Sequence, residues 1–125
     1  MSVGLFRDLP LPQPARLPGT PHDVAAEVQR ARNLIRHLTV LKVGADERYV
    51  LVSINWALQA LALRTSEPQA RTDREILEAL AVHAERRARD LLALPTESAG
   101  LRRDLPLIIR HIETARAMLR SWDEA

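Results

Sequence analysis

The chain lacks cysteine entirely and has few glycines and few aromatic residues. Without a thiol, disulfides, cysteine nucleophiles and cysteine-bound zinc or iron–sulfur sites are excluded. The aromatic side chains are Phe6, Tyr49, Trp56 and Trp122. A buried core must therefore be built from Leu, Ile, Val and Ala, a set that suits packed helices better than a sheet.

The chain also lacks a large excess of either charge, because 18 basic residues are balanced by 16 acidic ones and leave a net charge of +2. Lys42 is the one lysine, so the other basic residues are all arginines. The planar guanidinium of arginine binds phosphate and carboxylate groups well, although GC-rich coding would give the same composition. The overall charge alone does not indicate nucleic-acid binding.

Long apolar runs are missing as well. No run reaches the roughly 20 residues that a membrane-spanning helix needs, and the first residues lack the apolar segment of a signal peptide. The longest apolar stretch covers fifteen residues from Tyr49 to Leu63 and includes the polar residues Ser53, Asn55 and Gln59. We therefore expect a soluble, cytoplasmic protein without membrane association.

Proline is concentrated near the start of the chain, and apolar residues at helical spacing fill the rest. Four prolines between residues 10 and 18 predict an extended arm over residues 1–19. This arm also carries apolar side chains, so it either lies along a helical body or stays a solvated tail. Four helical segments joined by short links follow, which predicts antiparallel neighbours. The expected fold is all-α, an up-and-down four-helix bundle in a single domain over residues 20–125, with an extended Pro-rich N-terminal arm.

The first two predicted helices have recognisable ends. Thr20, with Asp23 three residues later, is typical of a helix N-terminus, and Gly44 is the expected C-terminal stop of this first helix. After a tight turn, the second helix is predicted from Asp46 to a point before Pro68.

The last two helices are predicted from similar signals. The capping-box pattern from Thr72 to Glu75 starts the third helix, and Pro95 ends it. In the fourth helix one heptad phase runs through Pro106, which predicts either a kink there or a helix that begins near Asp104. The apolar stripe of the third helix is Leu77, Leu80, Ala81, Ala84, Ala88 and Leu91.

The second helix carries two apolar rows, whereas a surface helix normally buries one stripe. The row that belongs to the bundle is Val50, Ile54, Ala57 and Leu61. The second row predicts an oligomer interface at Tyr49, Val52, Trp56 and Leu63. The alternative is that neighbouring helices and the arm cover every side of this helix. The pattern predicts a small non-enzymatic interaction or accessory protein that forms a homodimer or binds a protein partner.

A second candidate surface is the pole where the first and third helices end and the second and fourth begin. The basic residues near this pole are Arg36, Lys42, Arg48, Arg86, Arg87, Arg89, Arg102 and Arg103. Acidic residues lie in the same region, and arginines near helix C-termini also complement the helix dipole. This pole is either a solvated face or the contact surface of a DNA- or RNA-binding module.

A third candidate lies on the first helix, where Arg32 is followed by Asn33 and, after five positions, by His37. This R-x4-H string with Asn after the Arg resembles the motif of HEPN-type ribonucleases, helical bundles that are usually dimeric and cleave RNA without metal. The resemblance covers six residues and would make Arg32 and His37 the active pair, with Asn33 in support. It departs from that family, whose motif lies on a later helix. About 140° of helix rotation separates residues 32 and 37, so other helices would have to complete the site.

The four histidines do not form a metal-binding pattern. His83 and His111 are expected at similar heights on the third and fourth helices, but no Glu-x-x-His spacing of the di-iron bundles occurs. We therefore predict histidines that are solvated or lie at the rim of the bundle, no metal site and no cofactor.

Overall fold

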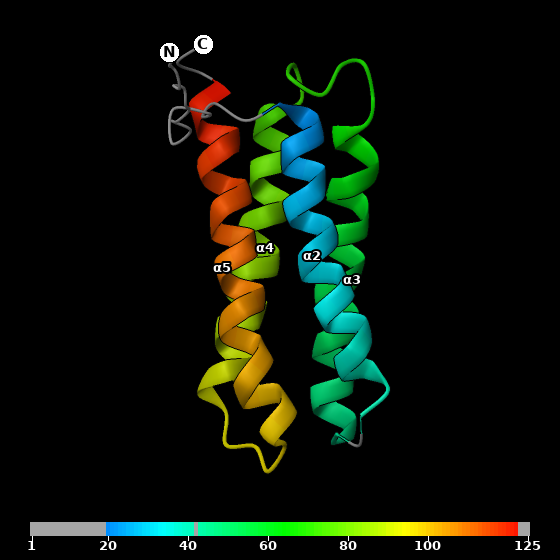
Figure 1. The fold of residues 1–125 in the computed structure, drawn as a ribbon, viewed down its shortest axis with the longest axis vertical. Coiled ribbons are helices and arrows are strands. Elements are labelled where there is room, and N and C mark those ends of the chain that lie inside the picture. The colour runs from blue at the N-terminus through cyan, green and yellow to red at the C-terminus, as the bar shows by residue number, and fades with distance from the viewer. Residues whose placement is uncertain (1–19, 42, 123–125) are drawn as a thin grey trace, which may run out of the picture.

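A computed structural model describes residues 20–41 and 43–122. In these residues the chain forms four helices and no strand (Figure 1). They are α2 (Pro21–Thr39), α3 (Ala45–Thr65), α4 (Arg74–Ala93) and α5 (Ala99–Ser121). The predicted arm over residues 1–19 lies outside the described residues, as do Lys42 and residues 123–125.

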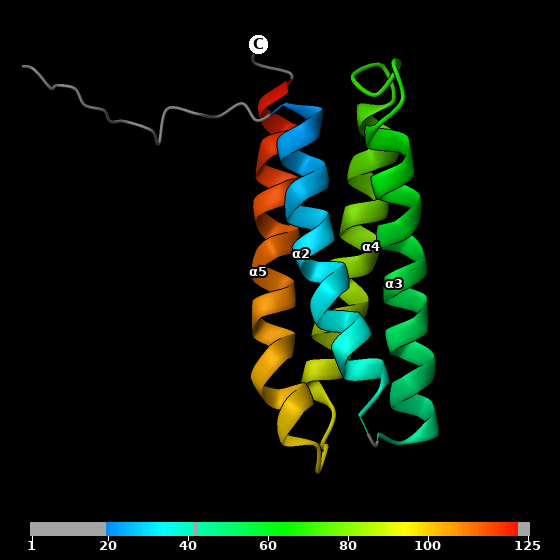
Figure 2. The same cartoon turned by 45° about the vertical axis from the view of Figure 1, so that its right-hand side comes forward.

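The four helices form one up-and-down bundle. Each helix packs against the helix before and after it, and α5 packs against α2 to close the ring. Figure 2 shows the consecutive helices running in opposite directions along a common axis. The predicted all-α, four-helix architecture is therefore confirmed.

One face of each helix fills the core. Leu, Ile, Val and Ala side chains at spacings of three and four are buried along all four helices, as the heptad patterns predict. From α2 and α5 the largest of these are Ile35, Leu38, Leu101, Leu105, Ile108 and Ile112. At the end of α5, Trp122 is buried and the guanidinium of Arg71 lies 5.1 Å from the centroid of its ring.

The link between α2 and α3 differs from the prediction for Gly44. Helix α2 ends at Thr39, with Val40 as its C-cap, and Gly44 is instead the N-cap of α3. The carboxylate of Glu47 accepts a hydrogen bond from the Gly44 amide at 2.8 Å. Arg48 donates to the carbonyl oxygen of Thr39 at 2.6 Å, so a side chain from the next helix covers the C-terminus of α2.

Two helix starts also differ from the prediction. The capping box expected at Thr72 does not form, because α4 begins at Arg74 without a side-chain cap. The Asp73 amide donates to carbonyls of the preceding turn instead. Helix α5 begins at Ala99, where the Ser98 hydroxyl accepts from an amide of the first turn. The proposed start near Asp104 is therefore wrong, and the helix continues through Pro106.

The predicted capping box at the start of α2 is present. The Thr20 hydroxyl accepts from the Asp23 amide at 3.1 Å, and Oδ2 of Asp23 accepts from the Thr20 amide at 3.0 Å. We predict that Thr20→Ala lowers the free energy of unfolding by about 1 kcal/mol. Urea denaturation followed by circular dichroism measures this change. Thr114→Ala, inside α5, is the matched control; equal losses for the two variants would contradict a role in capping.

Candidate functional site

Helix α3 has a buried face and an exposed apolar face. The buried side chains are Leu51, Ile54, Ala57, Leu58, Leu61 and Thr65. On the opposite face Tyr49 is 71% exposed, Val52 52%, Trp56 73% and Leu63 63%. From Tyr49 to Leu63 this face extends about 21 Å along the helix. Within the described part of the chain, no helix is both long and apolar enough to cross a membrane.

The inner face of α3 is wider than the row predicted for it. Ile54, Ala57 and Leu61 are buried as expected, whereas Val50 is half-buried and packs against the edge of the core. Leu51 and Leu58 are buried as well. The reason is that α3 packs against both α2 and α4, so its core stripe is broader than a seam facing a single helix.

Two shallow grooves lie along the exposed face of α3, one on either side of Trp56. The N-terminal groove has a volume of about 390 Å³ and is lined by Tyr49, Val52, Ser53, Trp56 and Ala57 of α3 with Leu80 and His83 of α4. The C-terminal groove, about 160 Å³, is lined by Trp56, Gln59, Ala60 and Leu63. Trp56 belongs to both, so it stands at the centre of the apolar face.

The apolar face turns toward α4, and the polar side of α3 turns toward α2. Asn55, on the α2 side, accepts a hydrogen bond at 3.4 Å from Nε of Arg32. Leu80 and His83 form the wall on the α4 side. The spacing of apolar residues along α3 predicted the exposed row. It could not predict the wall formed by α4, because that wall depends on how α4 packs against α3.

The structure does not bring the three residues of the ribonuclease-like string together. Arg32 faces α3, where it contacts Asn55. The Asn33 side chain is exposed and accepts a hydrogen bond from Gln29 at 2.8 Å. His37 is exposed near the end of α2. Nuclease activity at these residues stays a prediction.

The basic residues of the predicted pole do lie toward one end of the bundle, but many already bind groups of their own chain. Arg48 donates to carbonyls that follow α2, Arg102 donates to the Thr96 carbonyl, and Arg103 pairs with Asp104. Arg89 pairs with Glu85 and Glu113. Lys42 lies outside the described residues. Nucleic-acid binding by this pole stays a prediction.

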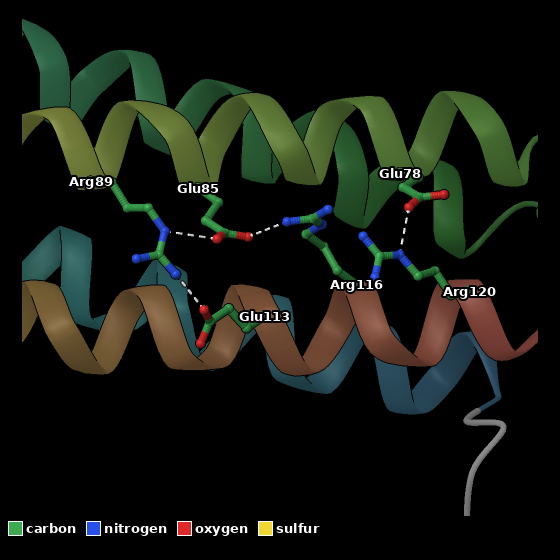
Figure 3. A network of polar contacts seen from close by, with 6 residues as sticks. All are labelled: Glu78, Glu85, Arg89, Glu113, Arg116 and Arg120. Atoms are coloured by element: carbon green, nitrogen blue, oxygen red, sulfur yellow. Dashed lines mark hydrogen bonds and ion pairs between the residues drawn. The ribbon is translucent and has the colours of Figure 1, made fainter.

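A network of ion pairs joins α4 to α5 (Figure 3). Glu85 on α4 is buried and accepts hydrogen bonds from Arg116 at 2.7 Å and from Arg89 at 2.8 Å. Nearer the other end, Glu78 accepts from Arg74 at 2.7 Å and from Arg120 at 3.0 Å. The pairs Arg74–Glu78 and Glu85–Arg89, each four residues apart on α4, could be read from the sequence, whereas the pairs with α5 could not.

This network shifts the acidity of its carboxyl groups. Burial alone would raise the pKa of Glu85, but the hydrogen bonds and positive charges of Arg116 and Arg89 outweigh burial and lower that pKa below its ordinary value. The pKa of Glu78 is lowered in the same way: burial opposes the change, and Arg120 and Arg74 outweigh it. Both carboxylates are therefore charged at neutral pH and connect the two helices.

The histidines occupy unrelated positions. His83 is exposed at the edge of the N-terminal groove. His111 lies on α5, where its Nδ1 is 2.9 Å from Oε1 of Glu27 on α2. The residues that the structure describes contain no group of three or more His, Asp or Glu side chains that could hold a metal ion.

Comparison with protein-family models, curated proteins and solved structures gives no significant match to this chain. The properties that bear on function are therefore those of the bundle itself. Nine large apolar side chains are exposed among the described residues, and four of them, including the aromatic Tyr49 and Trp56, lie on the exposed face of α3.

Proposed function

We propose that the protein is a small helical interaction module that forms a homodimer through the exposed face of α3. The observation that carries this proposal is the exposure of Tyr49, Val52, Trp56 and Leu63 on a helix whose opposite face already fills the core. Aromatic residues are enriched at the centres of protein interfaces, and charged residues are depleted there. The absence of charge from Tyr49 to Leu63 fits such a centre.

The aromatic surface available for burial at this face supports the proposed association. Tyr and Trp side chains each bury about 150–250 Å² when covered. At 71% and 73% exposure, covering Tyr49 and Trp56 removes about 300 Å² from water, or about 7 kcal/mol per copy at ~25 cal/mol per Å². Two copies together gain about 15 kcal/mol, which is comparable to the ~4–15 kcal/mol that association costs.

We predict that the unmutated chain has the mass of two copies in solution, whereas Trp56→Glu has the mass of one. The reason is that a carboxylate at the centre of a dry contact would lose its hydration without gaining a partner. We expect self-association to weaken at least tenfold, as measured by sedimentation equilibrium over a range of concentrations, with the helical circular dichroism unchanged.

The matched control is Leu107→Glu, which places the same charge at an exposed apolar position on α5. This variant should keep the mass of two copies. A well-folded monomer for the unmutated chain at several hundred micromolar would overturn the proposed function.

A further inference from the structure

We infer that the two copies pack α3 against α3 in antiparallel orientation, about a two-fold axis that passes beside Trp56. This inference rests on the proposed function and specifies its geometry. The contact would place Trp56 beside Trp56 of the second copy and Tyr49 opposite Leu63 of the second copy. The arrangement follows from the symmetry of the row, the two grooves and the charges at the ends of α3.

The exposed row is symmetric about Trp56. Tyr49 precedes it by seven residues and Leu63 follows it by seven. Seven residues are close to two helical turns, or about 10.5 Å, and rotate a side chain by only about 20° from the starting direction. A two-fold axis perpendicular to α3 at Trp56 therefore exchanges the positions of Tyr49 and Leu63, and an aromatic side chain meets an aliphatic one at both ends.

The grooves agree with the same axis. Because Trp56 separates them, the axis places each groove opposite the other end of the row on the second copy. Leu63 of the second copy lies over the N-terminal groove beside Tyr49 and Leu80, and Tyr49 of the second copy lies over the C-terminal groove. No charged residue of α3 between positions 49 and 63 has to be buried in this contact.

The charges at the ends of α3 distinguish antiparallel from parallel packing. Asp46 and Arg64 both lie about 80° around the helix from Trp56, on the same side. Antiparallel packing puts each Asp46 beside Arg64 of the other copy. Parallel packing puts the two copies of each residue at the same level but on opposite flanks of the contact, so it forms no such pair. Neither side chain forms a hydrogen bond or ion pair with the rest of the described chain, so both are free to pair across the contact.

The other charges in the first turn of α3 do not oppose the pairing. The carboxylate of Glu47 accepts a hydrogen bond from the Gly44 amide. Arg48 also lies in the first turn of α3, but its guanidinium donates to the carbonyl oxygens of Thr39 and Leu41. It is therefore turned toward the end of α2, on the side away from α4. Antiparallel packing also sets the positive end of each helix dipole beside the negative end of the other.

The absence of cysteine allows a direct test by disulfide mapping. Tyr49→Cys and Leu63→Cys are oxidised separately and as an equal mixture, and the products are identified by mass spectrometry. Antiparallel packing predicts a mixed disulfide between the two variants and little of either homodimeric disulfide, because Cβ atoms must come within about 3.5–4.5 Å. Homodimeric disulfides of both variants would establish parallel packing and overturn the inference.

A second test retains the whole apolar row and uses charge reversal. Asp46→Arg and Arg64→Asp should each weaken self-association about tenfold, because each creates two like-charged pairs. The double variant Asp46→Arg/Arg64→Asp should restore the affinity.

Failure of the double variant to restore the affinity, with the unmutated chain still dimeric, would overturn the antiparallel geometry alone. If the unmutated chain is monomeric, the proposed function is overturned as well. Residues 1–19 or another protein would then be the candidates to cover the exposed face of α3.

Discussion

Leu58→Ala is expected to lower the free energy of unfolding by about 2–5 kcal/mol, whereas Trp56→Ala should change that of the dissociated chain by less than about 0.5 kcal/mol. The two residues lie two positions apart on α3 and point in opposite directions. Leu58 is completely buried between the helices, so its truncation leaves a cavity. Trp56 is mostly exposed, so its truncation removes little packing within its own bundle.

Urea denaturation at concentrations low enough to dissociate the dimer measures both changes. Because a domain of this kind is stable by only about 5–15 kcal/mol, Leu58→Ala would remove a large part of its stability. Sedimentation equilibrium should show the opposite order for self-association, which Trp56→Ala should weaken more than Leu58→Ala does. If Trp56→Ala cost as much stability as Leu58→Ala in the dissociated chain, then Trp56 would be packed within its own chain and the exposed face of α3 would not be free.

The contrast between these two residues indicates what the sequence could predict. Heptad spacing separates residues on one side of a helix from those on the other, because side-chain direction depends only on position along the helix. It therefore predicted the bundle, most of the core and the exposed positions of Tyr49, Trp56 and Leu63. The same spacing predicted the four helices, since each carries a continuous apolar stripe, to which α3 adds a second, exposed row.

The features that could not be predicted depend on contacts between elements. Gly44 was expected to end α2, yet Arg48 of the next helix covers that end, and Gly44 begins α3. His111 is half-buried at the rim of the bundle, within the expectation, but its contact with Glu27 on α2 could not be predicted. The wall that Leu80 adds to the N-terminal groove likewise follows only from the packing of α4 against α3. A single-helix pattern cannot supply these positions, because they depend on the rotation of one helix relative to another.

The ion-pair network also depends on contacts between helices, and it bears on the arrangement of α4. Arg116 and Arg120 of α5 donate hydrogen bonds to carboxylates on α4, and these contacts join the two helices. The carboxylates Glu78 and Glu85 lie on the flank of α4 away from Leu80 and His83, which border the apolar face of α3. The network is therefore expected to support the candidate interface through the arrangement of α4 rather than through direct contact.

The second large effect is expected at Glu85, where substitution by alanine should lower the free energy of unfolding at pH 7 by about 2–3 kcal/mol. Removing this buried carboxylate takes away the hydrogen-bond acceptor of both Arg116 and Arg89. Arg116 would lose most, because its Nε is already buried without a hydrogen-bond partner. Glu113→Ala is the matched control: its half-exposed carboxylate pairs with Arg89 alone, so its loss should cost less than about 1 kcal/mol.

The difference in stability between the unmutated chain and Glu85→Ala should also depend on pH. The pKa of Glu85 is lower in the folded chain than its ordinary value of 4.5. Its carboxylate therefore stabilises the folded state above pH 4.5, and this contribution is lost as the pH falls through the folded-state pKa. Urea denaturation at pH 7, 5.5, 4 and 3, carried out in the Trp56→Glu background so that dissociation adds nothing, should show the difference narrowing only in the acidic samples. A difference that stayed constant down to pH 3 would mean that packing, rather than the charge of Glu85, accounts for its contribution.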